Sequence, residues 1–86
     1  MREFPTKYFS EQLKHIRKKY GGNIGIAKIM GIKVEQINNY TKGDPVNPTL
    51  EFLYNLLSEL GEDLNLLLTG EGLINTYILF NISIIL

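Results

Sequence analysis

Residues 33–42 contain a run of polar side chains whose chemistry suits the edges of DNA bases. Asn and Gln can each form two hydrogen bonds with adenine, Glu can accept one from cytosine, and Val can contact the methyl group of thymine. The residues that we assign to this role are Val34, Glu35, Gln36 and Asn39. This set favours reading of duplex DNA, and the alternative is a helix whose polar face meets only solvent.

Residues 23–43 predict the two short helices and the tight turn that would position these side chains. In the first helix, residues 24–30, Ile26, Ala27 and Met30 recur at helical spacing and should face inward. Gly31 supplies the left-handed conformation that a sharp turn needs. The second helix, residues 34–42, has only Ile37 and Tyr40 for the core. A helix with so few apolar residues keeps a face in solvent, which is the layout of a helix-turn-helix.

Three more helices are predicted around this pair, at residues 6–20, 50–60 and 63–68. Asn23 and Thr49 are candidate N-caps, because their side chains can accept hydrogen bonds from free backbone N–H groups. Gly25 should cost its helix about 1 kcal/mol relative to Ala. Two sets of apolar residues recur at helical spacing. In residues 6–20 they are Phe9, Leu13, Ile16 and Tyr20. In residues 50–60 they are Leu50, Leu53, Leu57 and Leu60, widened by Phe52 and Leu56.

The charge of the chain is segregated although its formal net value is zero. All nine Lys and Arg residues lie between Arg2 and Lys42, where three acidic residues oppose them, so residues 1–43 carry about +6. The rest of the chain has six acidic residues and no basic one. The basic half could neutralise phosphates while the acidic half faces away. The alternative is two solvated faces that differ by chance.

Residues 73–86 form a distinct tail without any charge, after a compact domain that we place at residues 1–72. The tail reads best as a half-buried strand of alternating pattern, although a helical stripe can also be drawn. A lone apolar strand has unpaired backbone groups, which pairing with a second copy would satisfy. We therefore expect a homodimer joined wholly or partly through the tail; the alternative is a tail folded back on its own domain. The dimerisation residues would be Ile74, Ile78, Phe80, Ile82 and Ile84.

Several short motifs together resemble the Cro and CI class of phage-type repressors, an XRE-like helix-turn-helix family. They run in family order over residues 9–72 and include residues 9–14, Ile26-Ala27, Gly31-Ile32, Ile37, Tyr40, Gly43, Pro48-Thr49 and residues 66–72. The resemblance implies an all-α, five-helix, lambda-repressor-like DNA-binding bundle. The loop between Gly43 and Thr49 is about two residues longer than usual in the family, and Gly25 stands where a polar helix former is frequent.

The resemblance also implies roles for individual residues. It places the first two turns of the second motif helix, with Val34, Glu35, Gln36 and Asn39, against bases. It places Asn23 at a helix start that binds a phosphate, where N–H groups and the helix dipole favour an anion. Further phosphate contacts are expected from basic and amide residues around the groove-facing surface, namely Lys28, Lys33, Lys42 and Asn47.

The function expected from these observations is sequence-specific binding of double-stranded DNA by a cytoplasmic repressor that acts as a homodimer on a palindromic operator. The alternative is an antitoxin-type protein-interaction module that regulates its own gene and holds a partner through its tail. Attachment to a membrane surface is a weaker option, because Lys42 is thirty residues before the tail. We expect no catalysis, cofactor or metal: the chain has no Cys and a single His.

Overall fold

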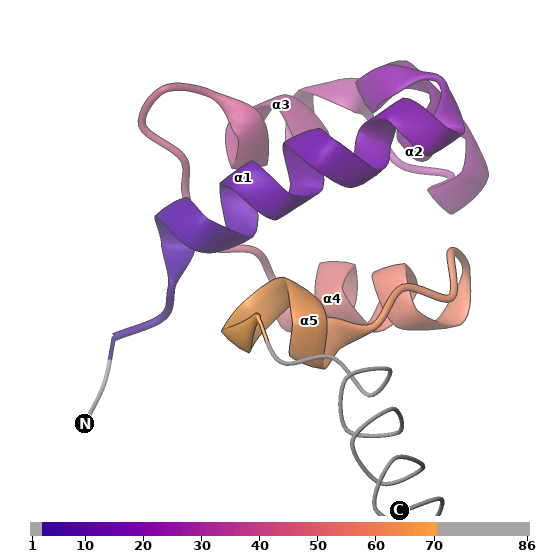
Figure 1. The fold of residues 1–86 in the computed structure, drawn as a ribbon. Coiled ribbons are helices and arrows are strands. Elements are labelled where there is room, and N and C mark those ends of the chain that lie inside the picture. Colours follow the sequence, from indigo (N-terminus) through magenta and orange to yellow (C-terminus); the bar gives the residue numbers. More distant parts are fainter. Residues whose placement is uncertain (1–2, 71–86) are drawn as a thin grey trace, which may run out of the picture.

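The computed structural model describes residues 3–70, which fold into five α-helices and one short 3₁₀ turn (Figure 1). In chain order they are α1 (Thr6–Ile16), the 3₁₀ turn η1 (Arg17–Tyr20), α2 (Gly22–Met30), α3 (Val34–Thr41), α4 (Leu50–Ser58) and α5 (Leu64–Thr69). This architecture confirms the predicted all-α bundle for the described part of the chain.

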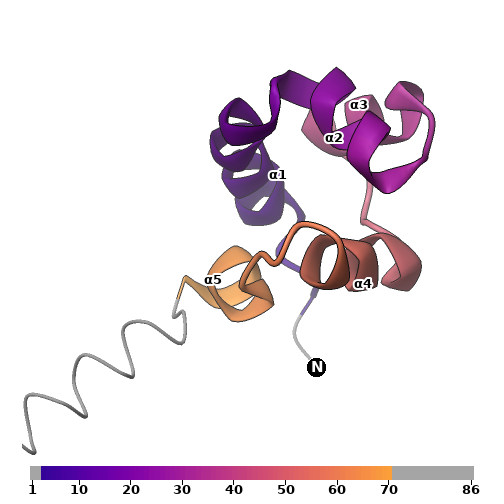
Figure 2. The ribbon, with the colours of Figure 1, turned by 90° about the vertical axis from the view of Figure 1, so that its right-hand side faces the viewer.

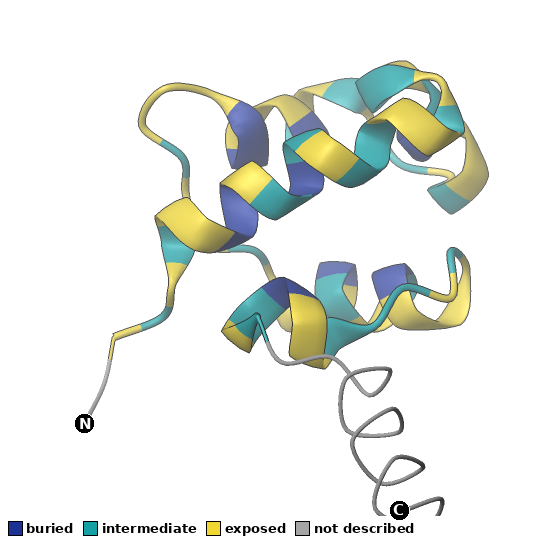
Figure 3. Ribbon diagram, in the orientation of Figure 1, coloured by how far each residue is buried: buried dark blue, intermediate teal, exposed yellow. Residues whose placement is uncertain are grey.

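The helices form two layers. Helices α1, α2 and α3 lie on one side and α4 and α5 on the other, as the two perpendicular views in Figures 1 and 2 show. The core fills the space between the layers, and the buried residues in Figure 3 lie on the faces that the layers turn toward each other. Every helix contributes to the core, which consists of Phe9, Leu13, Ile26, Ala27, Ile37, Tyr40, Phe52, Leu56 and Leu67.

Aromatic contacts link the two layers through Phe52 of α4. Its ring centroid lies 4.5 Å from that of Tyr40 on α3 and 6.5 Å from that of Phe9 on α1, the latter edge-to-face. Aromatic pairs at these separations are worth about 0.5–1.5 kcal/mol beyond the area they bury. The side of α3 that carries Tyr40 is therefore fixed against the core, and its other side remains available to solvent.

The first helix ends earlier than predicted. It stops at Ile16, and residues 17–20 continue as the tighter 3₁₀ turn η1, which ends at Gly21 with φ +86°. The Tyr20 hydroxyl lies 3.3 Å from the carbonyl oxygen of Leu60 and 3.1 Å from Oε1 of Glu62. These bonds hold the end of η1 on the turn between α4 and α5, which explains why the α-helical path is not continued to Tyr20.

The second helix begins at Gly22, two residues before the predicted start. Gly21 occupies the N-cap position and makes no side-chain capping bond, so the prediction that Asn23 caps α2 is wrong. The two consecutive glycines have φ values of +86° and +82° and turn the chain sharply into α2. Asn23 thus falls inside the first turn, where its side chain is free to make other contacts.

Gly25 occupies a position that no larger residue can fill. A Cβ atom added there would lie 1.5 Å from the carbonyl oxygen of Tyr20. The backbone at the end of η1 therefore crosses against the first turns of α2, and the helix-propensity cost predicted for Gly25 is the consequence of this close approach.

The predicted apolar stripe of the fourth helix is only partly buried. Leu50 and Leu57, which belong to that stripe, are 83% and 51% exposed, while Phe52 and Leu56 are almost completely buried. The core needs Phe52 between Tyr40 and Phe9, and this contact sets the rotation of α4. Helical spacing alone could not choose between two overlapping stripes on a helix rich in leucine.

The caps of the last two helices come from side chains. The Thr49 hydroxyl accepts a hydrogen bond of 3.0 Å from Phe52 N, as predicted. The Asp63 carboxylate accepts from Asn65 N at 2.9 Å, so Asp63 precedes α5 and is not its first residue. Likewise α3 ends at Thr41, with Lys42 extended, and α4 ends at Ser58. The predicted tail strand (residues 73–86) and its dimerisation residues lie outside the described residues.

Candidate nucleic-acid interface

A tight turn holds α2 and α3 in contact. Gly31 adopts φ +68° and its N–H donates to the Lys28 carbonyl at 3.3 Å, while Ile32 N donates to the Ala27 carbonyl at 3.1 Å. These bonds close the end of α2 with a left-handed glycine, as the sequence predicted. Lys33 is extended, and α3 begins at Val34. Two helices are thus joined by a short turn, and the second helix, α3, is buried on one side only.

Asn23 joins the two helices through its side-chain amide. Its Nδ2 donates to Oδ1 of Asn38 at 2.8 Å and to the Thr41 hydroxyl at 3.0 Å. Its Oδ1 accepts from Nη1 of Arg17 at 3.4 Å. Thr41 is itself fixed, because its hydroxyl donates to the Ile37 carbonyl at 3.2 Å. The first turn of α2 is therefore tied to the middle and the end of α3.

The four predicted base-reading residues differ in how freely they can reach a ligand. Glu35 and Asn39 are exposed and, within residues 3–70, their side chains make no hydrogen bond. They are four positions apart on α3 and so share a helix face. Gln36 is half-buried and its Nε2 donates to the Tyr40 hydroxyl at 3.2 Å. Val34 is half-buried and packs against the core.

The predicted phosphate ligands surround this exposed face of α3. Lys28, Lys33 and Lys42 are all exposed and come from α2, the turn and the end of α3. Asn47 is exposed in the loop after α3, and its Oδ1 accepts a hydrogen bond from the Thr6 hydroxyl. Val46 N donates to the Asn39 carbonyl at 3.1 Å, which fastens the same loop to α3.

A surface hollow of about 580 Å³ lies where the start of α2 meets α3. It is lined by Arg17, Gly21, Gly22, Asn23, Ile24, Val34 and Asn38. The first N–H groups of a helix lack partners within the helix, and the positive end of its dipole lies there. A phosphate that entered this hollow would also meet the Arg17 guanidinium and the backbone N–H of Asn23, whose side-chain Nδ2 already donates to Asn38 and Thr41.

Arg17 and Asn38 are residues that the sequence interpretation did not assign to the site. The sequence places Arg17 only within the basic half of the chain, whereas the structure places it in the hollow beside Asn23. Asn38 follows Val34 by four positions, so its place on the same side of α3 could have been read from helical spacing. Nothing in the sequence pairs Asn38 with Asn23, fifteen residues earlier.

Two other features, a metal site and a membrane span, were sought among the described residues. Among residues 3–70, no group of three His, Cys, Asp or Glu residues lies close enough to hold a metal ion. No helix in that range is long and apolar enough to cross a membrane.

A comparison with known families agrees with the geometry of α2 and α3. The family model described as helix-turn-helix matches residues 13–67, which covers every helix that forms the motif and most of the bundle around it. No curated protein and no solved structure matches the chain. The match spans well over half of the chain, and the chain therefore belongs to the helix-turn-helix family of the Cro and CI type, whose members are DNA-binding transcription regulators.

Proposed function

We propose that this protein is a repressor of the phage type that binds a palindromic operator as a homodimer, with α3 in the major groove. The observation that carries the proposal is the position of Glu35 and Asn39 on an exposed, polar face of α3, whose opposite face is locked into the core by Ile37 and Tyr40. A major groove admits one α-helix, and the side chains on its outer face reach the base edges.

The phosphate contacts proposed around α3 come from Lys28, Lys33, Lys42, Asn47 and the hollow at the start of α2. These residues would fix the register of the protein on the duplex without reading its sequence. Asn23 would act in two ways, since it braces Asn38 and also lies where a helix start can hold a phosphate.

The proposed homodimer rests on the apolar tail and on a second apolar surface. One helix-turn-helix reads only a few base pairs, and a dimer places two recognition helices about 34 Å apart. On α4, Leu50, Tyr54 and Leu57 are four and three positions apart and all more than half exposed. Contiguous exposed apolar residues on a small domain mark interaction sites. A second copy that covers this face and the tail residues Ile74, Ile78, Phe80, Ile82 and Ile84 would account for both surfaces.

Selection of bound duplexes from a random pool tests the function. We expect the parent protein to enrich a palindrome whose half-sites are about one helical turn apart. A pool that shows no enrichment over its starting composition would contradict sequence-specific binding. Enrichment of a single, asymmetric half-site would keep the DNA-binding role and contradict the dimer.

The dimer has its own test, in which the chain is cut after Gly72 and its mass in solution is measured. A monomer of the shortened chain beside a dimer of the full chain supports the tail as the interface. If the shortened chain stays dimeric and Tyr54→Glu makes it monomeric, α4 is the interface and the proposal for the tail is wrong. Copurification of the full chain with another protein, lost on truncation, would favour the antitoxin-type alternative.

A further inference from the structure

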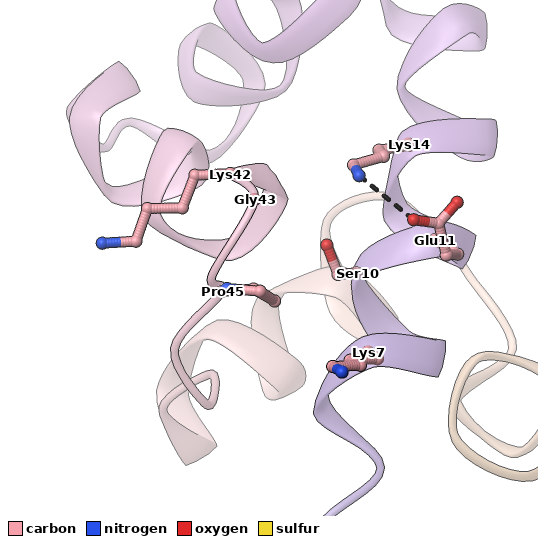
Figure 4. A pocket seen from close by; sticks show the side chains of 7 residues that line it. All are labelled: Lys7, Ser10, Glu11, Lys14, Lys42, Gly43 and Pro45. Atoms are coloured by element: carbon pink, nitrogen blue, oxygen red, sulfur yellow. Dashed lines mark hydrogen bonds and ion pairs between the residues drawn. The ribbon is translucent and has the colours of Figure 1, made fainter.

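A second concave site lies where the chain leaves the C-terminal end of α3. It is a pocket of about 260 Å³ between α1 and the segment that follows α3 (Figure 4). Its lining residues are Lys7, Ser10, Glu11, Lys14, Lys42, Gly43 and Pro45. None of the α1 residues among them has a role in the proposed reading of bases.

Ser10 gives this pocket a polar group without a partner. The residue is 2% exposed, and among residues 3–70 nothing hydrogen-bonds to its hydroxyl oxygen. In Figure 4 the hydroxyl points from α1 into the space in front of Gly43 and Pro45. Leaving a buried hydroxyl unpaired costs about 1–3 kcal/mol. A ligand that supplied an acceptor oxygen here would recover that cost.

The charges around Ser10 define which acceptor fits. Three lysines and one carboxylate line the pocket, so its net charge is positive. The carboxylate, Glu11, accepts from Lys14 at 3.1 Å in an ion pair that is open to solvent. Exposed pairs of this kind contribute little, about 0–1 kcal/mol, so Lys14 can turn to another anion. Lys42 extends away from the pocket in Figure 4, but its long, flexible stem allows its ammonium group to turn inward.

We propose that this pocket binds a phosphate group, with the Ser10 hydroxyl donating to one phosphate oxygen and Lys7, Lys14 and Lys42 supplying the opposing charge. Lysine serves as a point charge for phosphate, and a hydroxyl adds direction. The phosphate could belong to the DNA backbone that flanks the groove or to a free phosphate in solution. The first source rests on the proposed function, because Lys42 directly follows the recognition helix; the second does not.

Titration of the full chain with inorganic phosphate, at constant ionic strength made up with chloride, tests the site without DNA. Backbone amide NMR signals of residues 7–14 and 42–44 should shift together and saturate. Ser10→Ala should weaken binding about tenfold, since it removes a hydrogen bond to a charged group. Ser58→Ala, at an exposed serine of α4, is the matched control and should bind as the parent does.

Charge variants sharpen the same titration. Lys7→Gln should weaken phosphate binding several-fold, whereas Lys18→Gln, at an exposed lysine outside the pocket, should not change it. Glu11→Gln removes the one negative charge in the pocket and should tighten binding. Ser10→Ala must keep the amide spectrum of the folded parent, which shows that a weaker affinity reflects the lost hydroxyl. Phosphate that shifts no pocket signal, or that binds Ser10→Ala as tightly as the parent, would overturn the proposal.

A parallel titration with the selected duplex identifies the source of the phosphate. If a backbone phosphate occupies the pocket, Ser10→Ala and Lys7→Gln weaken DNA binding, and Lys7→Gln lowers the slope of log affinity against log salt concentration by about 0.9. If both variants bind DNA as the parent does while phosphate binding is impaired, the ligand is a free phosphate. If the protein binds phosphate but binds no duplex, the phosphate site is supported and the proposed DNA-binding function is contradicted.

Discussion

Asn23 and Asn38 join the two helices of the motif: Nδ2 of Asn23 donates to Oδ1 of Asn38 over 2.8 Å. The bond crosses from the first turn of α2 to the middle of α3, beside residues proposed to read bases. Because Thr41 accepts from the same nitrogen at 3.0 Å, one amide holds two points along α3. The angle between the helices therefore depends on a polar side chain as well as on the apolar contacts beneath it.

Asn23→Ala should lower both stability and DNA affinity. The variant loses the two hydrogen bonds to α3 and the longer one from Arg17. Each is worth about 0.5–1.5 kcal/mol net, so the free energy of unfolding should fall by about 1–3 kcal/mol. Denaturant unfolding followed by circular dichroism measures this change. Asn39→Ala is the matched control, because Asn39 is an exposed amide on the same motif, and its stability should stay within about 0.5 kcal/mol of the parent. Equal stability of the two variants would contradict a bracing role for Asn23.

Gly25→Ala should destabilise the protein severely, although Ala is the better helix former by about 1 kcal/mol. The new Cβ would lie 1.5 Å from the carbonyl oxygen of Tyr20, and only movement of the backbone can relieve that clash. We expect a loss of about 3 kcal/mol in the free energy of unfolding, at the upper end of the range for overpacking.

Gly43→Ala is the control for this effect, since a Cβ at Gly43 meets nothing within 4 Å and the backbone there is not left-handed. It should leave the thermal midpoint unchanged or raise it slightly. A Gly25→Ala protein as stable as the Gly43→Ala protein would show that η1 does not cross against α2 as described.

The rotation of α4 predicts that two leucines of this helix differ in how much they contribute to stability. Leu56 is fully buried, so Leu56→Ala should cost about 2–5 kcal/mol of unfolding free energy. Leu50 is 83% exposed, and Leu50→Ala should change stability by less than about 0.5 kcal/mol in a monomeric sample. Chemical denaturation at low protein concentration distinguishes them. If Leu50→Ala lowered the unfolding free energy more than Leu56→Ala, the apolar stripe predicted from the sequence would be favoured over the rotation described.

Alkaline pH should loosen the contact between η1 and the turn before α5. Burial raises the pKa of Tyr20 above its ordinary value of 10.0, and the Glu62 carboxylate raises it further. The hydrogen bond to Glu62 raises the pKa of Lys19 above 10.5. Both groups are therefore more readily protonated in the folded protein, and their stabilising contribution is complete below pH 10 and lost as the pH rises through the raised pKa values.

A comparison of the parent with Tyr20→Phe measures the tyrosine part of this effect. The unfolding free energy of the parent should fall more steeply above pH 10 than that of the variant, since Phe has no proton to lose. Between pH 6 and 9 the difference between the two proteins should be constant. Parallel curves across the whole alkaline range would contradict the raised pKa of Tyr20.

Much of this fold could be predicted because its signals are local. The left-handed Gly31, the Thr49 cap and the inward Ile37 and Tyr40 each follow from a few neighbouring residues. The predictions that were wrong concern features that are determined by contacts between residues far apart in the sequence. The rotation of α4 is set by Phe52 against residues of α1 and α3.

The candidate site shows the same division. The exposed positions of Glu35, Asn39 and the lysines around them could be predicted from helical spacing. The role of Asn23 could not, because a residue that looks like a cap acts through Asn38 on another helix. Arg17 lines the hollow from the first position of the 3₁₀ turn η1, and the helical pattern of residues 6–20 did not indicate this turn.

DNA cleavage from a chosen side chain tests most directly whether α3 enters the major groove. The chain has no cysteine, so Asn39→Cys provides one thiol for attaching a DNA-cleaving reagent. Ser58→Cys, on an exposed part of α4 in the opposite layer, is the control. We predict that the reagent attached at position 39 cuts within each half-site of the selected duplex, and that the reagent at position 58 does not. The cuts on the two strands should be staggered as expected for a reagent in the major groove. Cuts from position 58 alone, or a minor-groove stagger from position 39, would contradict the placement of α3.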